Sequence, residues 1–282
     1  MRRINTNEIK EKVCQLFIEA NYKLPQDIFE KIQNAAECEE KPIAKSILSK
    51  LVENCDAAEK INVPICQDTG MAVVFVELGQ EVFLEGENFE DAINAGVREA
   101  YDKGYMRKSV VDDPFFNRKN TDDNTPAIIY TKIVPGDRVK ITAAPKGFGS
   151  ENMSAVKMFT PSAKREDIIG FVVDTMKKAG SNPCPPVVIG VGLGGDFEYA
   201  AYLAKKALVR DTSVKNAHPE YALLEQDMLS AVNELPIGPQ GFGGKSTCLA
   251  VYVEYFPTHI AGLPCAVNIG CHVTRHASCV IC

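Results

Sequence analysis

Helix-like and strand-like segments alternate along most of this chain, and this order constrains its fold more than any other feature. Runs of β-branched and apolar residues, such as 71–78 and 187–195, are typical of buried strands. Between such runs lie stretches with apolar residues at helical spacing, such as 89–104 and 196–209. Strands that alternate with helices predict an α/β fold with mixed sheets flanked by helices.

The opening of the chain differs from the rest because its apolar residues follow only the helical spacing. Val13, Leu16 and Phe17 mark one amphipathic helix, and a similar pattern recurs further on. We therefore expect a helical N-terminal segment over residues 1–60. The sequence contains no internal repeat and no linker long enough to separate domains, so we expect residues 1–282 to form a single domain.

Composition and charge exclude several classes of function. The formal charge is −6 and the pI is near 5.4, with no basic tract, so nucleic acid is not expected as a partner. No run of about 18 apolar residues and no export signal is visible, which predicts a cytoplasmic protein that does not enter a membrane. An anionic substrate remains compatible with an acidic surface, because a few basic side chains focused in a cleft outweigh a diffuse field.

The chain has ten cysteines, which is a large number for a protein without an export signal. In a reducing compartment they should be thiols, so metal binding explains them better than disulfides. Cys14, Cys38 and Cys55 lie in helical patterns, and we expect them to be small core residues. Cys279 and Cys282 are expected to lie at a frayed C-terminus.

Three other cysteines lie in turns rich in Gly, Pro or Asn: Cys66 in PICQDTG, Cys184 in NPCPP and Cys271 in NIGCHVTRHA. Their separations of 118 and 87 residues match neither zinc ribbons nor ferredoxins. Thiolates nevertheless suit iron–sulfur clusters, and three of them on a four-iron cube leave one iron open as a Lewis acid. Gln67 and Asp68 follow Cys66 and could orient an oxygen-rich substrate. A non-catalytic iron–sulfur or zinc-stabilised protein is the alternative.

Glycine-rich segments suggest two further possibilities. Gly190, Gly192 and Gly195 fit the G-x-G-x-x-G fingerprint between a strand and a helix, which would indicate a nicotinamide-dependent oxidoreductase. The polar segment after that helix, however, offers no following strand and no acidic residue for a ribose. Residues 241–247, GFGGKST, resemble a phosphate loop, but Pro239 stands where that motif requires glycine. We expect a turn that leads into a strand.

Two loop regions in the middle of the chain are candidates for function. Residues 112–127 have the composition of a long irregular segment, and such segments in compact domains are usually functional. Two strands then follow, joined by the turn sequence PGD. After them comes KGFGSEN, whose glycines would let backbone N–H groups approach the carboxylate of a ligand.

Together these motifs resemble those of a known family. The chain resembles the alpha subunit of class I, iron–sulfur-dependent fumarate hydratase from about residue 5 to the end. The resemblance lies in seven segments, which occur in this order: PICQDTG, KGFGSEN, NPCPP, GVGLGG, IGPQGFGG, PTHIAGLP and CHVTRHA. The related alpha subunit of L(+)-tartrate dehydratase shares the cysteine framework and part of the IGPQG region. KGFGSENMS favours the fumarate hydratase.

The resemblance implies a cofactor and a reaction. Cys66, Cys184 and Cys271 would hold a 4Fe-4S cluster in which one iron lacks a protein ligand. The reaction would be the reversible hydration of fumarate to L-malate, with the open iron polarising the C2 hydroxyl. His272 and His276 are expected to have structural roles near Cys271.

The resemblance also assigns roles to individual residues. Gln67 and Asp68 would bind the substrate, and Asp68 would also act in catalysis as proton donor to the departing hydroxyl. Arg107 would bind a substrate carboxylate, for which a planar guanidinium is suited. The backbone of Gly149 would approach the substrate. His259, in PTH, would be a second catalytic residue.

The position of the last motif suggests a partner. The sequence ends eleven residues after Cys271, whereas single-chain class I enzymes continue into a second domain. The resemblance therefore implies a fumarase beta subunit that completes the site and supplies the base. We expect a dimer of alpha–beta pairs acting on a small dicarboxylate.

Overall fold

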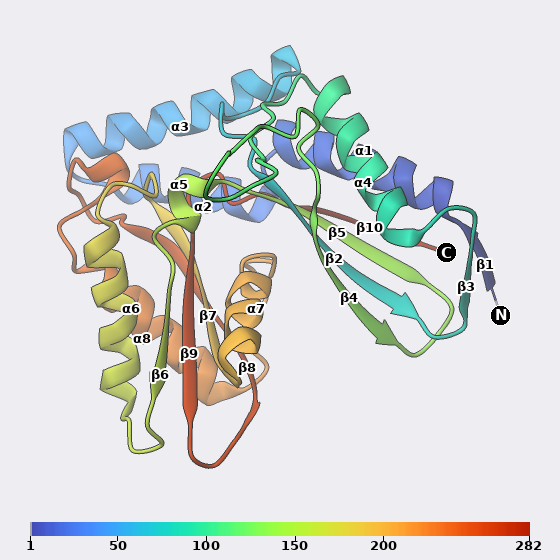
Figure 1. The fold of residues 1–282 in the computed structure, drawn as a ribbon. Coiled ribbons are helices and arrows are strands. Elements are labelled where there is room, and N and C mark those ends of the chain that lie inside the picture. The colour runs from blue at the N-terminus through green and yellow to red at the C-terminus, as the bar shows by residue number, and fades with distance from the viewer. Residues whose placement is uncertain (1) are drawn as a thin grey trace. The chain divides into compact units, whose positions relative to one another are not determined.

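The computed structural model describes residues 2–282, which divide into two compact units (Figure 1). The first unit contains the residues up to Pro25 together with Cys55–Phe148 and Arg275–Cys282. The second contains Gln26–Asn54 and Gly149–Thr274. Each unit is built from discontinuous segments, which explains why the sequence shows no linker at a boundary.

The first unit contains a four-stranded mixed sheet with the strand order β10-β5-β2-β4. Its central strand β2 (Met71–Gly79) pairs in parallel with β4 (Ile128–Val134) and antiparallel with β5 (Val139–Lys146). The edge strand β10 (Ala277–Ile281) pairs antiparallel with β5. The PGD turn does join β4 to β5, but these strands are not neighbours because β2 lies between them.

Two helices cover one face of this sheet. α1 (Thr6–Tyr22) and α4 (Phe89–Lys103) bury apolar residues in the same core cluster as β2, β5 and β10 (Figure 1). The side chain of Asn88 accepts hydrogen bonds from the first N–H groups of α4, which explains why this helix begins there. A small parallel pair, β1 (Arg2–Asn5) and β3 (Val82–Glu85), completes the unit.

The second unit contains another four-stranded mixed sheet, in the order β6-β9-β7-β8. Its central strands β7 (Val187–Gly195) and β9 (Leu263–Gly270) are antiparallel. The edge strand β8 (Cys248–Thr258) is parallel to β7, and β6 (Ala155–Phe159) is antiparallel to β9. The long connection from β7 to β8 contains two helices, as a parallel pair requires.

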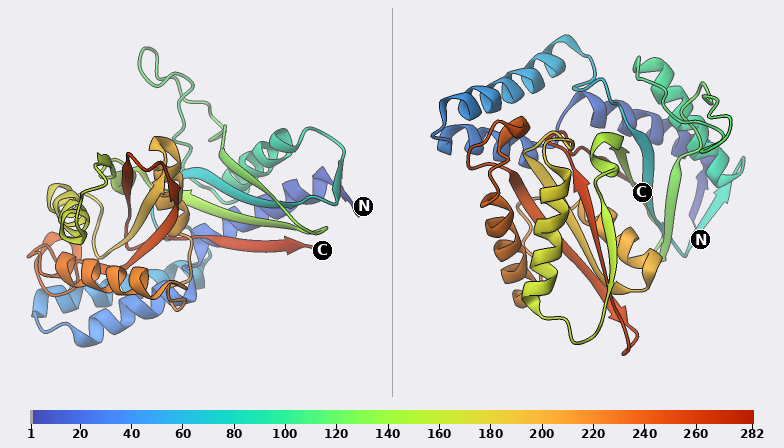
Figure 2. Two further views of the ribbon diagram at one scale, coloured as in Figure 1. Left: turned by 90° about the horizontal axis from the view of Figure 1, so that it is seen from below. Right: turned by 60° about the vertical axis from the view of Figure 1, so that its left-hand side comes forward.

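Helices lie on both faces of this second sheet. α6 (Arg165–Ala179) and α8 (Pro219–Asn233) share a core with the odd-numbered residues of β7, from position 187 to 193. α7 (Phe197–Ala207) packs on the opposite face, as Figure 1 and Figure 2 show. Helices flanking mixed sheets confirm the predicted fold class.

The glycines of β7 have a packing role. A Cβ atom at Gly190 would lie 2.0 Å from the carbonyl oxygen of Ala204, and one at Gly192 would lie 2.0 Å from that of Ala200. α7 therefore approaches the strand so closely that only glycine fits. Because Gly195 is also within β7, the G-x-G-x-x-G pattern lies in a strand and not in a phosphate-binding turn.

The predicted N-terminal helical segment is confirmed, and it contributes to both units. α1 belongs to the first unit, α2 (Gln26–Cys38) to the second, and α3 (Pro42–Ile61) extends from residues of the second unit into residues of the first. The other short elements of the second unit are α5 (Phe148–Glu151), which starts at the last residue of the first, and η1 (Pro239–Gly241).

The cysteine predictions outside the loops are partly confirmed. Cys14 and Cys55 are buried, and burial raises the pKa of the Cys55 thiol to about 11. The prediction for Cys38 is wrong, because this last residue of α2 is exposed. The predicted fraying is wrong for Cys279, which lies in β10, pairs with β5 and packs partly against the core, while Cys282 is exposed after the strand.

The GFGGKST segment forms the expected turn into β8. The buried carboxylate of Glu39 accepts a hydrogen bond of 2.8 Å from the backbone N–H of Lys245. The ammonium of Lys41 donates to the carbonyl of Phe242 at 2.7 Å. This segment is therefore held as a structural turn within the second unit.

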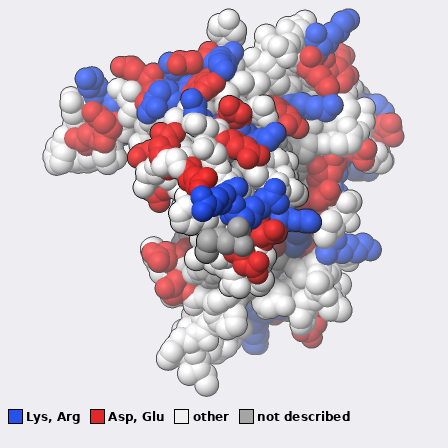
Figure 3. Space-filling view, turned by 90° about the vertical axis from the view of Figure 1, so that its right-hand side faces the viewer, with Lys and Arg blue, Asp and Glu red and all other residues white. Residues whose placement is uncertain are grey.

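Charged side chains of both signs share the surface. On the face drawn in Figure 3, Lys and Arg side chains lie beside Asp and Glu side chains. Exposed ion pairs such as Arg3–Glu85 and Lys50–Glu53 are examples of this mixing. Within residues 2–282, none of the helices has the combination of length and apolar character needed to cross a bilayer.

Candidate active site

The Cys66 loop connects α3 to β2 in the first unit, and its end is fixed by a glycine. Gly70 has φ +77°, a conformation that favours glycine. A Cβ atom at this position would also lie between 2.7 and 2.9 Å from backbone atoms of Lys146. The loop can therefore enter β2 at this point only with glycine in place.

Buried polar side chains hold the backbone of this loop. The Tyr101 hydroxyl donates to the carbonyls of Thr69 and Gly70, at 2.8 Å each. The amide of the fully buried Asn124 donates to the Gly70 carbonyl at 3.2 Å. The Thr69 hydroxyl donates to the carbonyl of Arg107 at 3.0 Å. Burial raises the pKa of Tyr101, so its hydroxyl stays protonated as the donor.

Asp68 has the most constrained side chain of the loop. One carboxylate oxygen accepts from the Gly70 N–H at 3.0 Å and the other from the Phe148 N–H at 3.1 Å. Its backbone carbonyl accepts from the guanidinium of the buried Arg275. A Cβ at Gly147 would lie 3.1 Å from the Asp68 carboxylate, so the first glycine of KGFG permits this approach.

The remaining predicted residues of the first unit either precede Asp68 in the chain or are joined to the same loop by a hydrogen bond. Cys66 is partly exposed, and its sulfur lies 3.6 Å from the side-chain oxygen of Gln67. Arg107 has an exposed side chain, while its backbone is fixed by the Thr69 hydroxyl. The structure thus brings Cys66, Gln67, Asp68 and Arg107 to one loop region of the first unit.

The other two cysteine loops meet in the second unit. Cys184 is exposed and has φ +54°, which is rare for a residue with a side chain. Cys271 directly follows β9 and is partly exposed. The ring Nδ1 of His272 lies 2.9 Å from the Cys184 carbonyl, so residues 87 positions apart are held side by side. This confirms the structural role predicted for His272.

Gln240 in η1 was not recognised from the sequence, although it contacts the Cys184 loop. Its backbone N–H and its side-chain amide both donate to the carbonyl of Pro185, at 2.7 and 2.8 Å. Tyr101 and Asn124 were missed as well. Gln240 and Asn124 are polar residues in turns, and Tyr101 is an aromatic residue of α4; such residues are too common to be singled out from a sequence.

Gly149 and His259 lie elsewhere in the second unit. Gly149 is in α5, where a Cβ would make an ordinary contact of 3.6 Å with the Asn182 carbonyl. His259 lies in the exposed turn between β8 and β9, and its Nδ1 accepts from the Ala261 N–H at 3.1 Å. The eight residues of β9 separate this turn from Cys271 by roughly 25 Å, at about 3.3 Å per residue. The unit does not bring His259 to its cysteine loops.

The thiols divide into two groups by burial. Burial raises the pKa of the core cysteines Cys248 and Cys265 to about 12, which keeps these thiols protonated. The three loop thiols are exposed or partly exposed, as ligands that must reach a metal group would be. Their donor chemistry fits an iron–sulfur cluster. Within either unit, as far as residues 2–282 describe it, no three His, Cys, Asp or Glu side chains form a metal-ion site.

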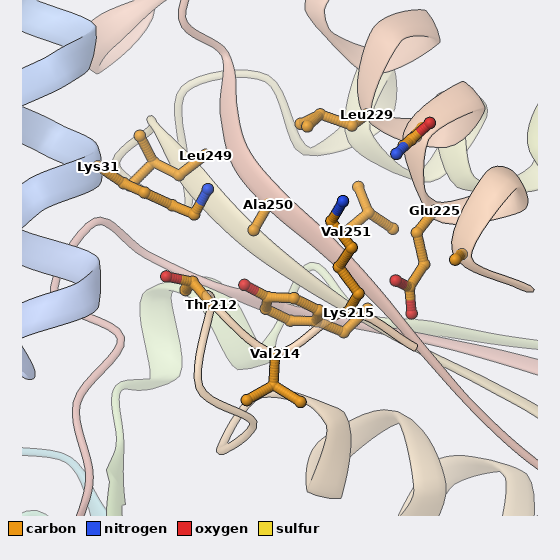
Figure 4. A pocket seen from close by; sticks show the side chains of 12 residues that line it. Lys31, Thr212, Val214, Lys215, Glu225, Leu229, Leu249, Ala250 and Val251 are labelled. Atoms are coloured by element: carbon orange, nitrogen blue, oxygen red, sulfur yellow. The ribbon is translucent and has the colours of Figure 1, made fainter. Parts of the chain in front are cut away.

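Two hollows in the second unit lie apart from the cysteine loops. The first, of about 190 Å³, lies between α2, α8, β8 and the segment after α7, and the Lys31 and Lys215 side chains project into it (Figure 4). The second, of about 240 Å³, is lined by Glu151, Lys205, Asn268 and small residues. Neither is lined by a candidate residue, so the candidate active site remains at the loops.

Comparison with known proteins gives a consistent result. Residues 10–280 match the family described as fumarate hydratase (Fumerase). A protein of Methanocaldococcus jannaschii, provisionally named L(+)-tartrate dehydratase subunit alpha, is 39% identical over 275 residues, covering 96% of each chain. The L(+)-tartrate dehydratase subunit alpha of Escherichia coli O157:H7 is 30% identical over 277 residues, covering 98% of this chain and 91% of that one.

Proposed function

The chain belongs to the fumarate hydratase family, a family of hydro-lyases, and we propose that it is the alpha subunit of a two-subunit iron–sulfur hydro-lyase. The proposed reaction is the reversible hydration of fumarate to L-malate. The family match over residues 10–280 includes all three loop cysteines, the Asp68 loop and the KGFG turn. The observation that supports it most is the pairing of the Cys184 and Cys271 loops through His272.

We propose that Cys66, Cys184 and Cys271 are the ligands of a 4Fe-4S cluster. Two of the three are already held side by side, and all three thiols are accessible, unlike those in the cores. When bound, a cluster with one iron lacking a protein ligand would supply a Lewis acid for the hydroxyl and carboxylate oxygens of the substrate.

Side chains of the first unit would transfer a proton to the substrate and bind its carboxylate. Asp68, oriented by two backbone N–H groups, would deliver a proton to the C2 hydroxyl oxygen as the C–O bond breaks and water leaves. In the hydration direction the same carboxylate would take that proton back. Gln67 would orient the substrate through its amide. Arg107, whose guanidinium is exposed while its backbone is fixed, would bind a carboxylate in bidentate geometry.

Two assigned residues have weaker geometric support. The backbone at Gly149, at the start of α5, would approach the substrate. His259 would act in catalysis, although it lies at the far end of β9 from Cys271. A catalytic role of His259 would therefore not involve contact with the cysteine loops of its own unit.

We further propose a beta subunit that completes the site. Dehydration also requires a base that removes the C3 proton, and a second cation that stabilises the neighbouring carboxylate. Both similar proteins are named as alpha subunits, which supports a partner of this kind. We place the base on this partner and expect a dimer of alpha–beta pairs.

Dehydration of L(+)-tartrate is the second candidate. It is favoured by the names of the similar proteins, including one that is 39% identical over nearly the full length of both chains. Fumarate is preferred here because of the KGFGSENMS segment. Both reactions break a C–O bond next to a carboxylate, so they need the same kinds of catalytic and binding groups.

One assay tests the proposal. The chain would be co-expressed without oxygen with a candidate small subunit and assayed against fumarate, L-malate and both tartrate enantiomers. We expect hydration of fumarate, with kcat/KM at least tenfold above that for tartrate. Preferential tartrate turnover would replace the first candidate with the second. Cluster-loaded protein that acts on none of these substrates would refute both.

A further inference from the structure

Gln240 combines a strained backbone with a side chain that has a specific target. Its φ of 52° and ψ of 18° place a non-glycine residue in the left-handed region, which costs about 1 kcal/mol or more. Its neighbours Gly238 and Gly241 also have positive φ, and there glycine avoids the strain. A side chain kept at such a position is expected to make contacts that offset this cost.

The contacts of Gln240 converge on the residue that follows Cys184. The backbone N–H and the side-chain amide both donate to the carbonyl of Pro185, at 2.7 and 2.8 Å. A carbonyl oxygen has two lone pairs, so one residue satisfies the whole acceptor capacity of this group. The Cys184 loop is therefore attached to η1 at a single point by two hydrogen bonds.

His272 attaches the same loop from the other side. Its Nδ1 lies 2.9 Å from the Cys184 carbonyl and 3.4 Å from the Gln240 amide nitrogen. A carbonyl can only accept, so the shorter contact requires the proton on Nδ1, and the ring then packs against the Gln240 amide without accepting from it. His272 and Gln240 thus bind two successive carbonyl groups, those of Cys184 and Pro185.

Cys184 needs such attachment. Its φ of +54° is itself strained, and its own side chain is exposed, so packing of the Cys184 side chain does not offset the strain. The flanking Pro183, Pro185 and Pro186 are buried and anchor the segment, and hydrogen bonds to the carbonyls of Cys184 and Pro185 add to this packing. Pro185 cannot donate a backbone hydrogen bond, so its carbonyl is the backbone group that remains for attachment.

We propose that Gln240 is a positioning residue that holds the Cys184 turn so that the sulfurs of Cys184 and Cys271 are presented together before a cluster is bound. This inference rests on the proposed function, since it takes both cysteines as cluster ligands. Loss of groups that orient metal ligands typically reduces metal affinity about 10- to 100-fold. The amide of Gln240 should therefore govern how firmly the cluster is retained.

The test compares two variants of Gln240 in the full-length chain. Gln240→Glu keeps the size of the side chain but directs an oxygen toward the Pro185 carbonyl, so attraction becomes repulsion. Gln240→Gly removes the side chain, relieves the backbone strain and keeps the backbone hydrogen bond. Gln226→Glu, at an exposed position of α8, is the matched control for the added charge.

Each protein would be reconstituted anaerobically with ferrous iron and sulfide. The measurements are iron and sulfide per chain, the visible absorbance of the cluster and the rate of iron loss to a chelator, with thermal unfolding of the apo-protein as a folding check. We expect both Gln240 variants to lose iron about tenfold faster than the parent and Gln226→Glu. If Gln240→Glu does not fold, Gln240→Gly decides the question, because it introduces no strain.

The outcomes separate the inference from the proposed function. Equal retention in the parent and in folded Gln240 variants would overturn the positioning role and leave the cluster assignment intact. Failure of the parent chain to take up a cluster would overturn both. Rapid iron loss from both glutamate variants, with retention by Gln240→Gly equal to that of the parent, would overturn the inference, because the effect would then come from charge alone.

Discussion

The Cys66 loop and the paired Cys184 and Cys271 loops are held in different ways. The first is fixed by the buried side chains of Tyr101 and Asn124, and where it enters β2 the positive φ falls on Gly70. The second pair is fixed by hydrogen bonds from Gln240 and His272 and by buried prolines, and its positive φ falls on Cys184 itself. Strain at a glycine costs little, whereas strain at Cys184 must be offset by the buried prolines beside it and by the hydrogen bonds to its carbonyl and that of Pro185.

The largest expected effect is a loss of cluster binding and activity without a loss of stability. Cys66→Ala should abolish cluster binding and hydration, because a ligand is lost, while thermal unfolding of the apo-protein stays nearly unchanged. Cys38→Ala, at an exposed thiol outside the loops, should change neither. Iron content, absorbance and activity are the measurements. A Cys66→Ala protein with a full, active cluster would remove this loop from the site.

Gly70→Ala should show how firmly the core-supported loop is built. The added methyl group would meet the Lys146 backbone at less than 3 Å, so we expect a loss of at least about 4 kcal/mol in the free energy of unfolding. Gly136→Ala is the control, because φ is +104° there but no atom lies within 4 Å. It should cost only about 1–2 kcal/mol. Similar losses in both would mean that strain, and not the contact with Lys146, constrains the loop.

Asn124→Ala should measure how much the hydrogen bonds of Asn124 contribute to the stability of the same loop. Asn124 donates to the Gly70 carbonyl and accepts from the Ser109 N–H at 2.7 Å, with φ +60°. Loss of both hydrogen bonds and a strained alanine should together cost about 3 kcal/mol in the free energy of unfolding. Asn124→Gly should recover about 1 kcal/mol of this by relieving strain. Equal stability of all three proteins in denaturant unfolding would show that the support lies elsewhere.

The smallest effect concerns the core cysteines of the second unit. Burial raises the pKa of Cys248 and of Cys265 from 9.0 to about 12, so the folded state keeps their protons where the unfolded state releases them. Stability should therefore be constant below about pH 9 and fall above it, by up to about 1.4 kcal/mol per pH unit for each thiol. Cys265→Ala should reduce this slope in denaturant titrations between pH 9 and 11. An unchanged slope would contradict the raised pKa of Cys265.

Much of the fold could be predicted because local patterns determine it. The β-branched run of β7 and the helical spacing of α4 and α8 identify those elements without tertiary information. The pairing of strands could not be predicted in the same way. β2 enters between β4 and β5, although a short turn joins those two, because pairing depends on contacts between distant segments. The short strand β10 was missed, since five residues with no strong alternation resemble a loose end.

The loops of the candidate site could be singled out from the sequence, whereas the residues that support them could not, and the ligand role of the cysteines stays a prediction. Cys66, Cys184 and Cys271 are recognisable because they lie in turns, where cysteine has no packing role. Gln240 and Asn124 act through hydrogen bonds to backbone groups, and such contacts leave no spacing pattern in a sequence. The roles of Asp68, Arg107, Gly149 and His259 rest on resemblance and stay predictions.

The place of β2 at the centre of its sheet has a consequence for movement. Met71, one residue after the Cys66 loop, is already in register with Lys146, and from Val73 onward the strand is paired on both sides. Displacing Asp68 along the direction of β2 would shift the register of this strand, and a shift of one residue would turn its buried side chains outward. We therefore expect Asp68 to keep a fixed position relative to β2, and any movement in this unit to fall on segments outside the sheet such as 107–127.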